Sequence, residues 1–267
     1  MFYIDYQIPI IERQQYAAKY RTNPVNLTDL RFKEPLIRLE SVNVSYESYY
    51  AKNDGKNPPY NCRIAGSRED VWLRRSVAEK LARVNEKLRP FQVELFVLDG
   101  YRPVECQQGM WDFHYANAQK KFPEANEEVW RKDALGHASP ATNFNPLDST
   151  TWLPHTTGAA IDLTLRELDS QNLVNMGSNF EEITLISRTD YFERQLLQGL
   201  ISKDDPRLQY RRLLYWAMLQ EDLINDPLVY WHYDWGNQLY LRDRKALFGD
   251  APQAAWYGYI EPPPRKR

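Results

Sequence analysis

The sequence has 267 residues, 43% of them hydrophobic and 13% aromatic, a composition typical of a folded globular chain and not of a disordered one. Lysine and arginine number 34 against 36 aspartates and glutamates, a net charge of −2, which does not indicate a nucleic-acid or membrane-surface partner. No apolar run approaches the roughly 18 residues of a membrane span. Asp5 lies where a signal peptide would be positively charged, so we expect a cytoplasmic protein. A periplasmic protein whose signal was removed is the alternative.

The two cysteines, Cys62 and Cys106, are too few for a disulfide framework, and no CxxC pair suggests a zinc ribbon. Two buried thiols are the favoured prediction. A single disulfide between them is the alternative.

The first half of the chain predicts elements that alternate irregularly. In chain order we expect an extension over 1–34 lying on the domain, a strand within 35–46, a loop over 51–61, a helix over 68–88 capped by Ser67, a strand over 91–97 that turns at Asp99, and a helix over 104–121.

The second half contains a long irregular stretch, a type of segment that is often functional. The expected order is this stretch over 139–155, a strand over 158–165, a helix from 204–206 through Leu219, a strand over 229–235 continuing to about Leu241, and a mobile basic tail over 261–267. Strands scattered among helices predict an α+β fold, with a mainly antiparallel central sheet flanked by helices in one domain over 35–260.

Three residues in the second half suggest a metal site. His155 precedes Asp162 by seven residues, with Gly158 at the turn into a strand, and His232 lies in the last predicted strand with Asp234 on the same face. Taken alone, each residue could equally form an ordinary buried hydrogen bond instead of binding a metal. Together, two imidazoles and one carboxylate suit a catalytic zinc with an open fourth position. The other histidines, His114 and His137, are predicted to be structural.

Sequence motifs add a family resemblance. The segments "DGYRP" (99–103), "HTTGAAIDLTL" (155–165) and "YWHY" (230–233), in this order, resemble the zinc D-alanyl-D-alanine dipeptidases of the vancomycin-resistance (VanX) type. The resemblance covers roughly residues 35–242, and the most specific part is an HxxGxAxD core. It implies the hedgehog-like D,D-peptidase fold and hydrolysis of a short cell-wall-type dipeptide.

The resemblance also assigns roles. It makes His155, Asp162 and His232 the ligands of one zinc ion per chain. It makes Arg102 the cation that stabilises the developing oxyanion. Glu181 falls where the family has an aspartate that holds the dipeptide's ammonium group. We further predict substrate contacts for Tyr101 and Trp231, which belong to the same motifs.

Two positions depart from the family pattern. Leu153 replaces a serine, and Val229 replaces the glutamate three residues before the second histidine, the family's general base. Valine cannot move a proton, and a positioned base is typically worth about 10² to 10⁴ in rate. Asp234 is a candidate substitute, while Asp226 is predicted to lie in a turn. Two hypotheses follow: an impaired zinc dipeptidase, or a catalytically inactive homologue that binds a small peptide or other ligand in the same pocket.

Overall fold

A computed structural model describes residues 3–264, and it contains six α-helices and two sheets within that range. The helices are α1 (Arg75–Leu88), α2 (Val104–Lys121), α3 (Glu127–Leu135), α4 (Tyr191–Leu197), α5 (Pro206–Leu219) and α6 (Gln238–Phe248). The strands are β1 (Leu36–Arg38), β2 (Ser45–Tyr46), β3 (Trp72–Arg74), β4 (Val93–Asp99), β5 (Ala160–Glu167), β6 (Ile224–Asn225) and β7 (His232–Asp234).

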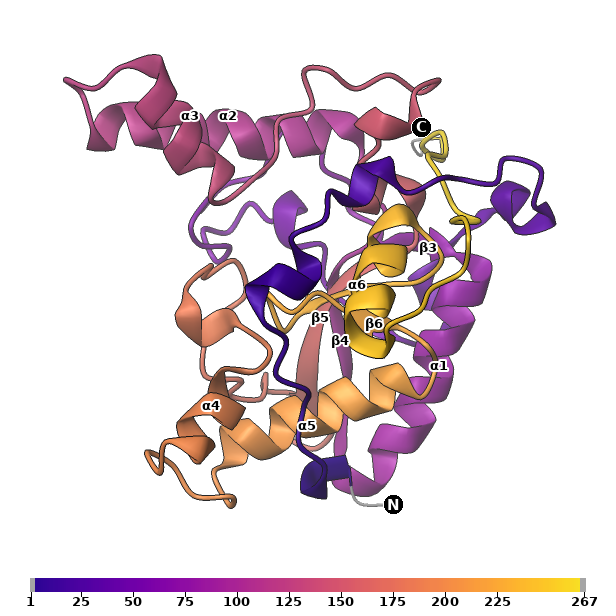
Figure 1. The fold of residues 1–267 in the computed structure, drawn as a ribbon, viewed down its shortest axis with the longest axis vertical. Coiled ribbons are helices and arrows are strands. Elements are labelled where there is room, and N and C mark those ends of the chain that lie inside the picture. Colours follow the sequence, from indigo (N-terminus) through magenta and orange to yellow (C-terminus); the bar gives the residue numbers. More distant parts are fainter. Residues whose placement is uncertain (1–2, 265–267) are drawn as a thin grey trace.

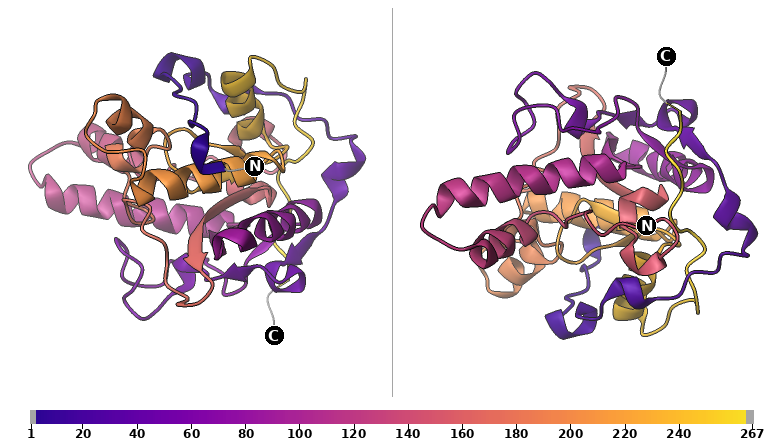
Figure 2. Two further views of the ribbon diagram at one scale, coloured as in Figure 1. Left: turned by 90° about the horizontal axis from the view of Figure 1, so that it is seen from below. Right: turned by 90° about the horizontal axis from the view of Figure 1, so that it is seen from above.

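The larger sheet confirms the predicted α+β class. Its strand order is β2-β4-β5-β7-β6, and every neighbouring pair is antiparallel except β2 with β4. Strands β1 and β3 form a separate antiparallel pair. Helices α1 and α5 pack against β4 and β5, whereas α2 and α3 form a hairpin on the opposite side of the molecule (Figures 1 and 2). The two longest strands, β4 and β5, therefore form the centre of the fold.

Helix α1 begins later than the sequence predicted. The apolar series ending at Leu88 is buried as expected, but Ser67 caps no helix and residues 72–74 form β3. Leu73 pairs with Ile37 of β1, and the fully buried Arg74 is held by backbone carbonyl groups. Pairing with β1 thus overrides helical propensity before Arg75.

The last predicted strand is also too long. β7 contains only three residues, and Gly236 turns the chain with a φ of 73°. The Asn237 side chain then accepts a hydrogen bond from the Tyr240 backbone and caps α6. The helix from Pro206, with Asp205 as its cap, agrees with the prediction.

Residues 3–34 run over the outside of the later elements, as Figure 1 shows in indigo. The Tyr3 hydroxyl donates to Gln220, the Ile8 backbone donates to Glu193, and Asn26 donates to the carbonyl of Ala255. The proposed boundaries of this extension, at 34 and 35, stay predictions. Of the predicted tail, residues 265–267 lie outside the described range.

Both cysteines are free, so the alternative of a disulfide is wrong. Cys106 is buried as predicted, but Cys62 is exposed because it lies in a loop of the segment before β3. Within residues 3–264, no helix has the length and apolar content to cross a membrane.

Candidate metal centre

Sheet register brings together two of the predicted metal ligands. Asp162 of β5 and His232 of β7 are directly opposite each other in the antiparallel ladder, so their side chains share one face of the sheet. Asp99, the last residue of β4, is opposite Asp162 on the other side. The three side chains form one row across the sheet.

A short 3-10 turn, Pro154–Thr157, carries the third predicted ligand, His155. Gly158 ends the turn with a φ of 68°, and a Cβ atom there would lie 2.3 Å from a methyl group of Leu36. Glycine is therefore required on both steric and conformational grounds. Arg74 fixes the same turn, because its backbone N–H donates to the Gly158 carbonyl and its Nε donates to that of Thr157.

The three side chains converge at ligand distance. His155 Nε2 lies 3.3 Å from His232 Nδ1 and 3.3 Å from Asp162 Oδ2, and His232 Nδ1 lies 2.8 Å from Asp162 Oδ1. A tetrahedral zinc with bonds of about 2.0–2.2 Å separates its ligand atoms by about 3.3 Å. Two of the three separations match this value and the third is shorter. The donor set and its spacing fit a zinc ion.

The outer nitrogen of each imidazole faces a group that can orient it. His155 Nδ1 donates to the Gly100 carbonyl at 2.8 Å and lies 3.2 Å from Asp99. His232 Nε2 lies 2.9 Å from Asp234, and Asp234 in turn accepts a hydrogen bond from Asn237. Each ring therefore presents its other nitrogen to Asp162, the arrangement that metal-binding histidines usually have.

Charge within the cluster favours an ionised ligand. Burial opposes ionisation of Asp162, but the imidazoles of His155 and His232 outweigh it and hold the pKa of this carboxyl well below its usual range. The two imidazoles therefore keep Asp162 in its charged form. Burial raises the pKa of the neighbouring Asp99, although Arg102 and His155 act against this shift.

We expect Asp234→Asn to weaken zinc binding by about 10- to 100-fold, the usual effect of removing a carboxylate that orients a metal-binding histidine. The amide keeps the shape of the side chain but removes its negative charge beside His232. Titration of metal-free protein with zinc against a competing chelator measures the change. Unchanged affinity would contradict the orienting role.

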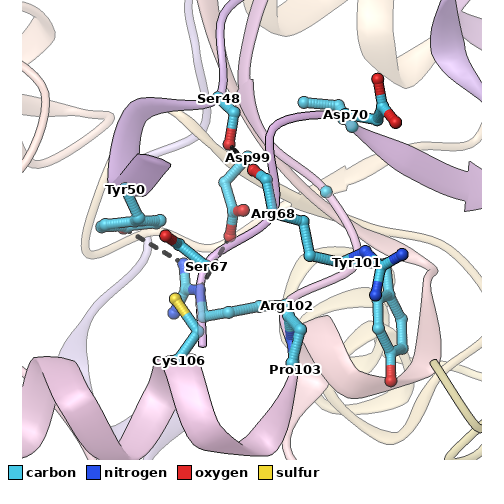
Figure 3. A pocket seen from close by; sticks show the side chains of 12 residues that line it. Ser48, Tyr50, Ser67, Arg68, Asp70, Asp99, Tyr101, Arg102, Pro103 and Cys106 are labelled. Carbon is cyan, nitrogen blue, oxygen red and sulfur yellow. Dashed lines mark hydrogen bonds and ion pairs between the residues drawn. The ribbon is translucent and has the colours of Figure 1, made fainter. Parts of the chain in front are cut away.

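Arg102 lies beside the cluster, as its motif predicted. Its guanidinium donates to Asp99 at 2.8 Å, to Gln107 at 2.8 Å, to the Tyr50 hydroxyl at 3.2 Å and to Asp162 at 3.1 Å. Figure 3 shows the side chain between Asp99 and Tyr50 at the wall of a small cavity. Arg102 is therefore a fixed positive charge next to Asp162, a predicted metal ligand.

Glu181 is connected to the same cluster through Tyr50. The Tyr50 hydroxyl donates to one carboxylate oxygen at 2.7 Å, and the Tyr60 hydroxyl donates to the other at 2.9 Å. Burial raises the pKa of Glu181, and the hydrogen bond from Tyr50 opposes that shift. His114 contacts the Tyr60 hydroxyl at 3.2 Å and stacks on His137, outside the metal cluster. Sequence reasoning did not identify Tyr50 or Tyr60.

Trp231 and Tyr101, the two aromatic residues predicted to contact the substrate, lie in different surroundings. Trp231 is buried against Phe180, the neighbour of Glu181, with ring centroids 5.4 Å apart. Tyr101 donates its hydroxyl hydrogen to the carbonyl of Ile260 and points away from the Arg102 guanidinium in Figure 3. This geometry supports a role for Tyr101 in holding the C-terminal segment and gives no support to a substrate contact.

Val229 lies in the turn between β6 and β7, outside the strand in which it was predicted. It is half-buried and packs against the core. Nearby Asp226 accepts hydrogen bonds from the Leu228 backbone and from Arg242, so it serves the turn. Asp99 accepts a hydrogen bond from Arg102 and lies near the outer nitrogen of His155, and Asp234 lies between the outer nitrogen of His232 and the Asn237 amide. Among residues 3–264, these three aspartates therefore already have partners in the turn or around the candidate ligands.

Comparison with known proteins identifies the family. Residues 47–248 match the M15 peptidase family model described as D-ala-D-ala dipeptidase. The chain is also 30% identical, over 206 residues, to a D-alanyl-D-alanine dipeptidase of Synechocystis sp., a match covering 73% of this chain and 81% of the relative. The chain belongs to the D-Ala-D-Ala dipeptidase family. The resemblance drawn from the sequence motifs is confirmed.

Two solved structures share less sequence with this chain. One is a mutant of the D,D-pentapeptidase VanY in complex with zinc, with 15% identity, a TM-score of 0.35, and coverage of 72% of this chain and 88% of that one. The other is VanYB in complex with D-Ala-D-Ala, with 15% identity, a TM-score of 0.36, and coverage of 76% and 94%.

Proposed function

We propose that this member of the D-Ala-D-Ala dipeptidase family hydrolyses D-Ala-D-Ala or a similar short dipeptide in a zinc-dependent reaction, and that Val229 limits its turnover. The observation that supports the proposal is the convergence of His155, Asp162 and His232 at spacings that suit zinc. Zinc at such a site polarises a carbonyl and makes water more acidic.

The residues around the triad would hold the substrate. Arg102 would attract the carbonyl oxygen as it gains negative charge, since its planar guanidinium is fixed beside Asp162. Glu181 would receive the ammonium group, because its carboxylate is anchored by two hydroxyl groups in an otherwise aromatic setting. These two charges would orient the dipeptide across the metal centre.

The second candidate is a binding protein without hydrolytic activity. A specific observation favours it: valine occupies the position of the family's general base, Asp99 is paired with Arg102, and Asp234 is paired with His232. Such a protein would keep the zinc site and the ammonium contact but release the dipeptide intact.

The test measures how zinc-loaded protein binds and hydrolyses three peptides: D-Ala-D-Ala, L-Ala-L-Ala and N-acetyl-D-Ala-D-Ala. We expect binding of D-Ala-D-Ala, slow release of D-alanine, and markedly weaker binding of the acetylated peptide, because acetylation removes the charge that Glu181 would contact. Binding without any release of D-alanine would support the second candidate. Absence of binding would contradict both, and equal binding of the acetylated peptide would exclude the role of Glu181.

A further inference from the structure

Arg211 of α5 is a buried cation whose known contacts within residues 3–264 are backbone carbonyls and aromatic rings. It is only 2% exposed. Burial lowers its pKa to about 10, so the guanidinium remains charged at neutral pH. Placing such a charge in the interior is costly unless hydrogen bonds satisfy its donors. The location of its acceptors therefore identifies what the residue holds in place.

All four acceptors lie in one segment, the Glu181 loop (residues 176–188). Nε donates to the Met176 carbonyl at 2.8 Å, at the start of the loop. The two Nη atoms donate at its end, with separations of 3.0 Å, 3.5 Å and 2.9 Å to the carbonyls of Ile186, Ser187 and Arg188. A single planar group therefore joins both ends of the loop.

Tyr230 connects this clamp to the metal-binding strand. The Arg211 guanidinium lies over the Tyr230 ring, 3.8 Å from its centroid. The Tyr230 backbone donates to the Ser187 carbonyl, and its hydroxyl donates to that of Ser178. Because Tyr230 is two residues before His232, the loop is fixed to the chain that supplies a predicted metal ligand.

The loop needs this support because Glu181 has an unfavourable backbone conformation. Its φ is 66°, in the left-handed region that non-glycine residues rarely occupy. Such a conformation persists only when the surrounding structure enforces it. Without the clamp, the backbone can relax and carry the carboxylate away from Tyr50 and Tyr60.

We propose that Arg211, together with Tyr230, is a positioning residue that fixes Glu181 at the substrate-binding end of the metal pocket. The proposal rests on the proposed function, in which Glu181 contacts the dipeptide ammonium group. Arg211 itself touches no substrate and acts through the loop backbone. Lysine at this position keeps the charge but cannot donate to four carbonyls in one plane.

The test is a double-mutant cycle on zinc-loaded protein, with the dissociation constant for D-Ala-D-Ala as the readout. We expect Arg211→Lys to weaken binding about tenfold, equivalent to about 1.4 kcal/mol, in the wild-type background. In a Glu181→Gln background the same change should have less than about a twofold effect, since coupled residues are not additive. Zinc content should stay equal throughout. Arg207→Lys, on the same helix but paired with Asp205, is the matched control and should change nothing.

Tyr230→Phe keeps the ring under Arg211 but removes the hydrogen bond to Ser178, and it provides a second, milder perturbation if Arg211→Lys fails to fold. Its weakening of D-Ala-D-Ala binding should likewise disappear in the Glu181→Gln background. Equal weakening in both backgrounds, or none, would overturn the positioning role alone. Failure of the wild-type protein to bind the dipeptide would overturn the proposed function and this role with it.

Discussion

Replacing His232 with alanine should remove most of the bound zinc and abolish any zinc-dependent hydrolysis. The change deletes one of three donors that lie 2.8–3.3 Å apart, so the loss of affinity should exceed the 10- to 100-fold effect of removing an orienting carboxylate. Metal analysis after dialysis at a fixed free zinc concentration gives the stoichiometry. We expect one zinc per wild-type chain and far less in the variant.

His137→Ala is the matched control for this experiment. His137 is exposed and lies outside the metal cluster, stacked on His114. Its removal should leave the zinc content unchanged. Equal zinc in wild type and His232→Ala would show that the ligand assignment is wrong. Loss of zinc in both variants would indicate a general effect on folding, which thermal unfolding of the metal-free proteins would reveal.

Two of the three candidate metal ligands, His155 and Asp162, could be paired from the sequence because their determinants are local. The turn after His155 ends in a left-handed backbone conformation, which favours Gly158. The strand that follows the turn carries Asp162 seven residues after His155. These constraints appear in the sequence as a short motif. His232 is ambiguous by itself, and it could be added because it completes the set of two imidazoles and one carboxylate and lies in the YWHY motif of the family resemblance.

Asp99 could not be assigned a role in this way. Regular alternation along β4 places it on the same face as Val97, in the core. A register shift between Val97 and Asp99 reverses this, so that Asp99 faces Asp162. Periodicity in the sequence contains no sign of the shift. Tyr50 and Arg211 were missed for a related reason, since their partners are distant in sequence and Arg211 uses backbone acceptors.

The sequence also misplaced Val229 in a strand. The strand prediction relied on aromatic and β-branched residues, but the Asn225 side chain donates to the carbonyls of Val229, Tyr230 and His232 and stabilises a turn. The chemical prediction about Val229 does not depend on this assignment, because it concerns the absence of a carboxylate.

Val229→Glu should raise the turnover of D-Ala-D-Ala by about 10² to 10⁴, the range for a positioned general base. Hydrolysis requires one group to take a proton from the attacking water and return it to the leaving nitrogen. Arg102 cannot do so, since it stays protonated, and the described aspartates near the triad contact the imidazoles or Arg102. The new carboxylate should therefore increase kcat far more than it lowers KM. Turnover of both proteins is measured at matched zinc content.

Val229→Gln is the control that separates proton transfer from shape, because glutamine has the size of glutamate but cannot act as a base at neutral pH. We expect it to remain as slow as the wild-type protein. An equal gain with glutamine would attribute the effect to packing in the half-buried turn. Rapid wild-type hydrolysis that is lost in Asp234→Asn, without a drop in zinc content, and is not improved by the new glutamate would show that Asp234 is the base. In that case Asp234 takes the role that the family's glutamate has at position 229, and the protein is an efficient dipeptidase.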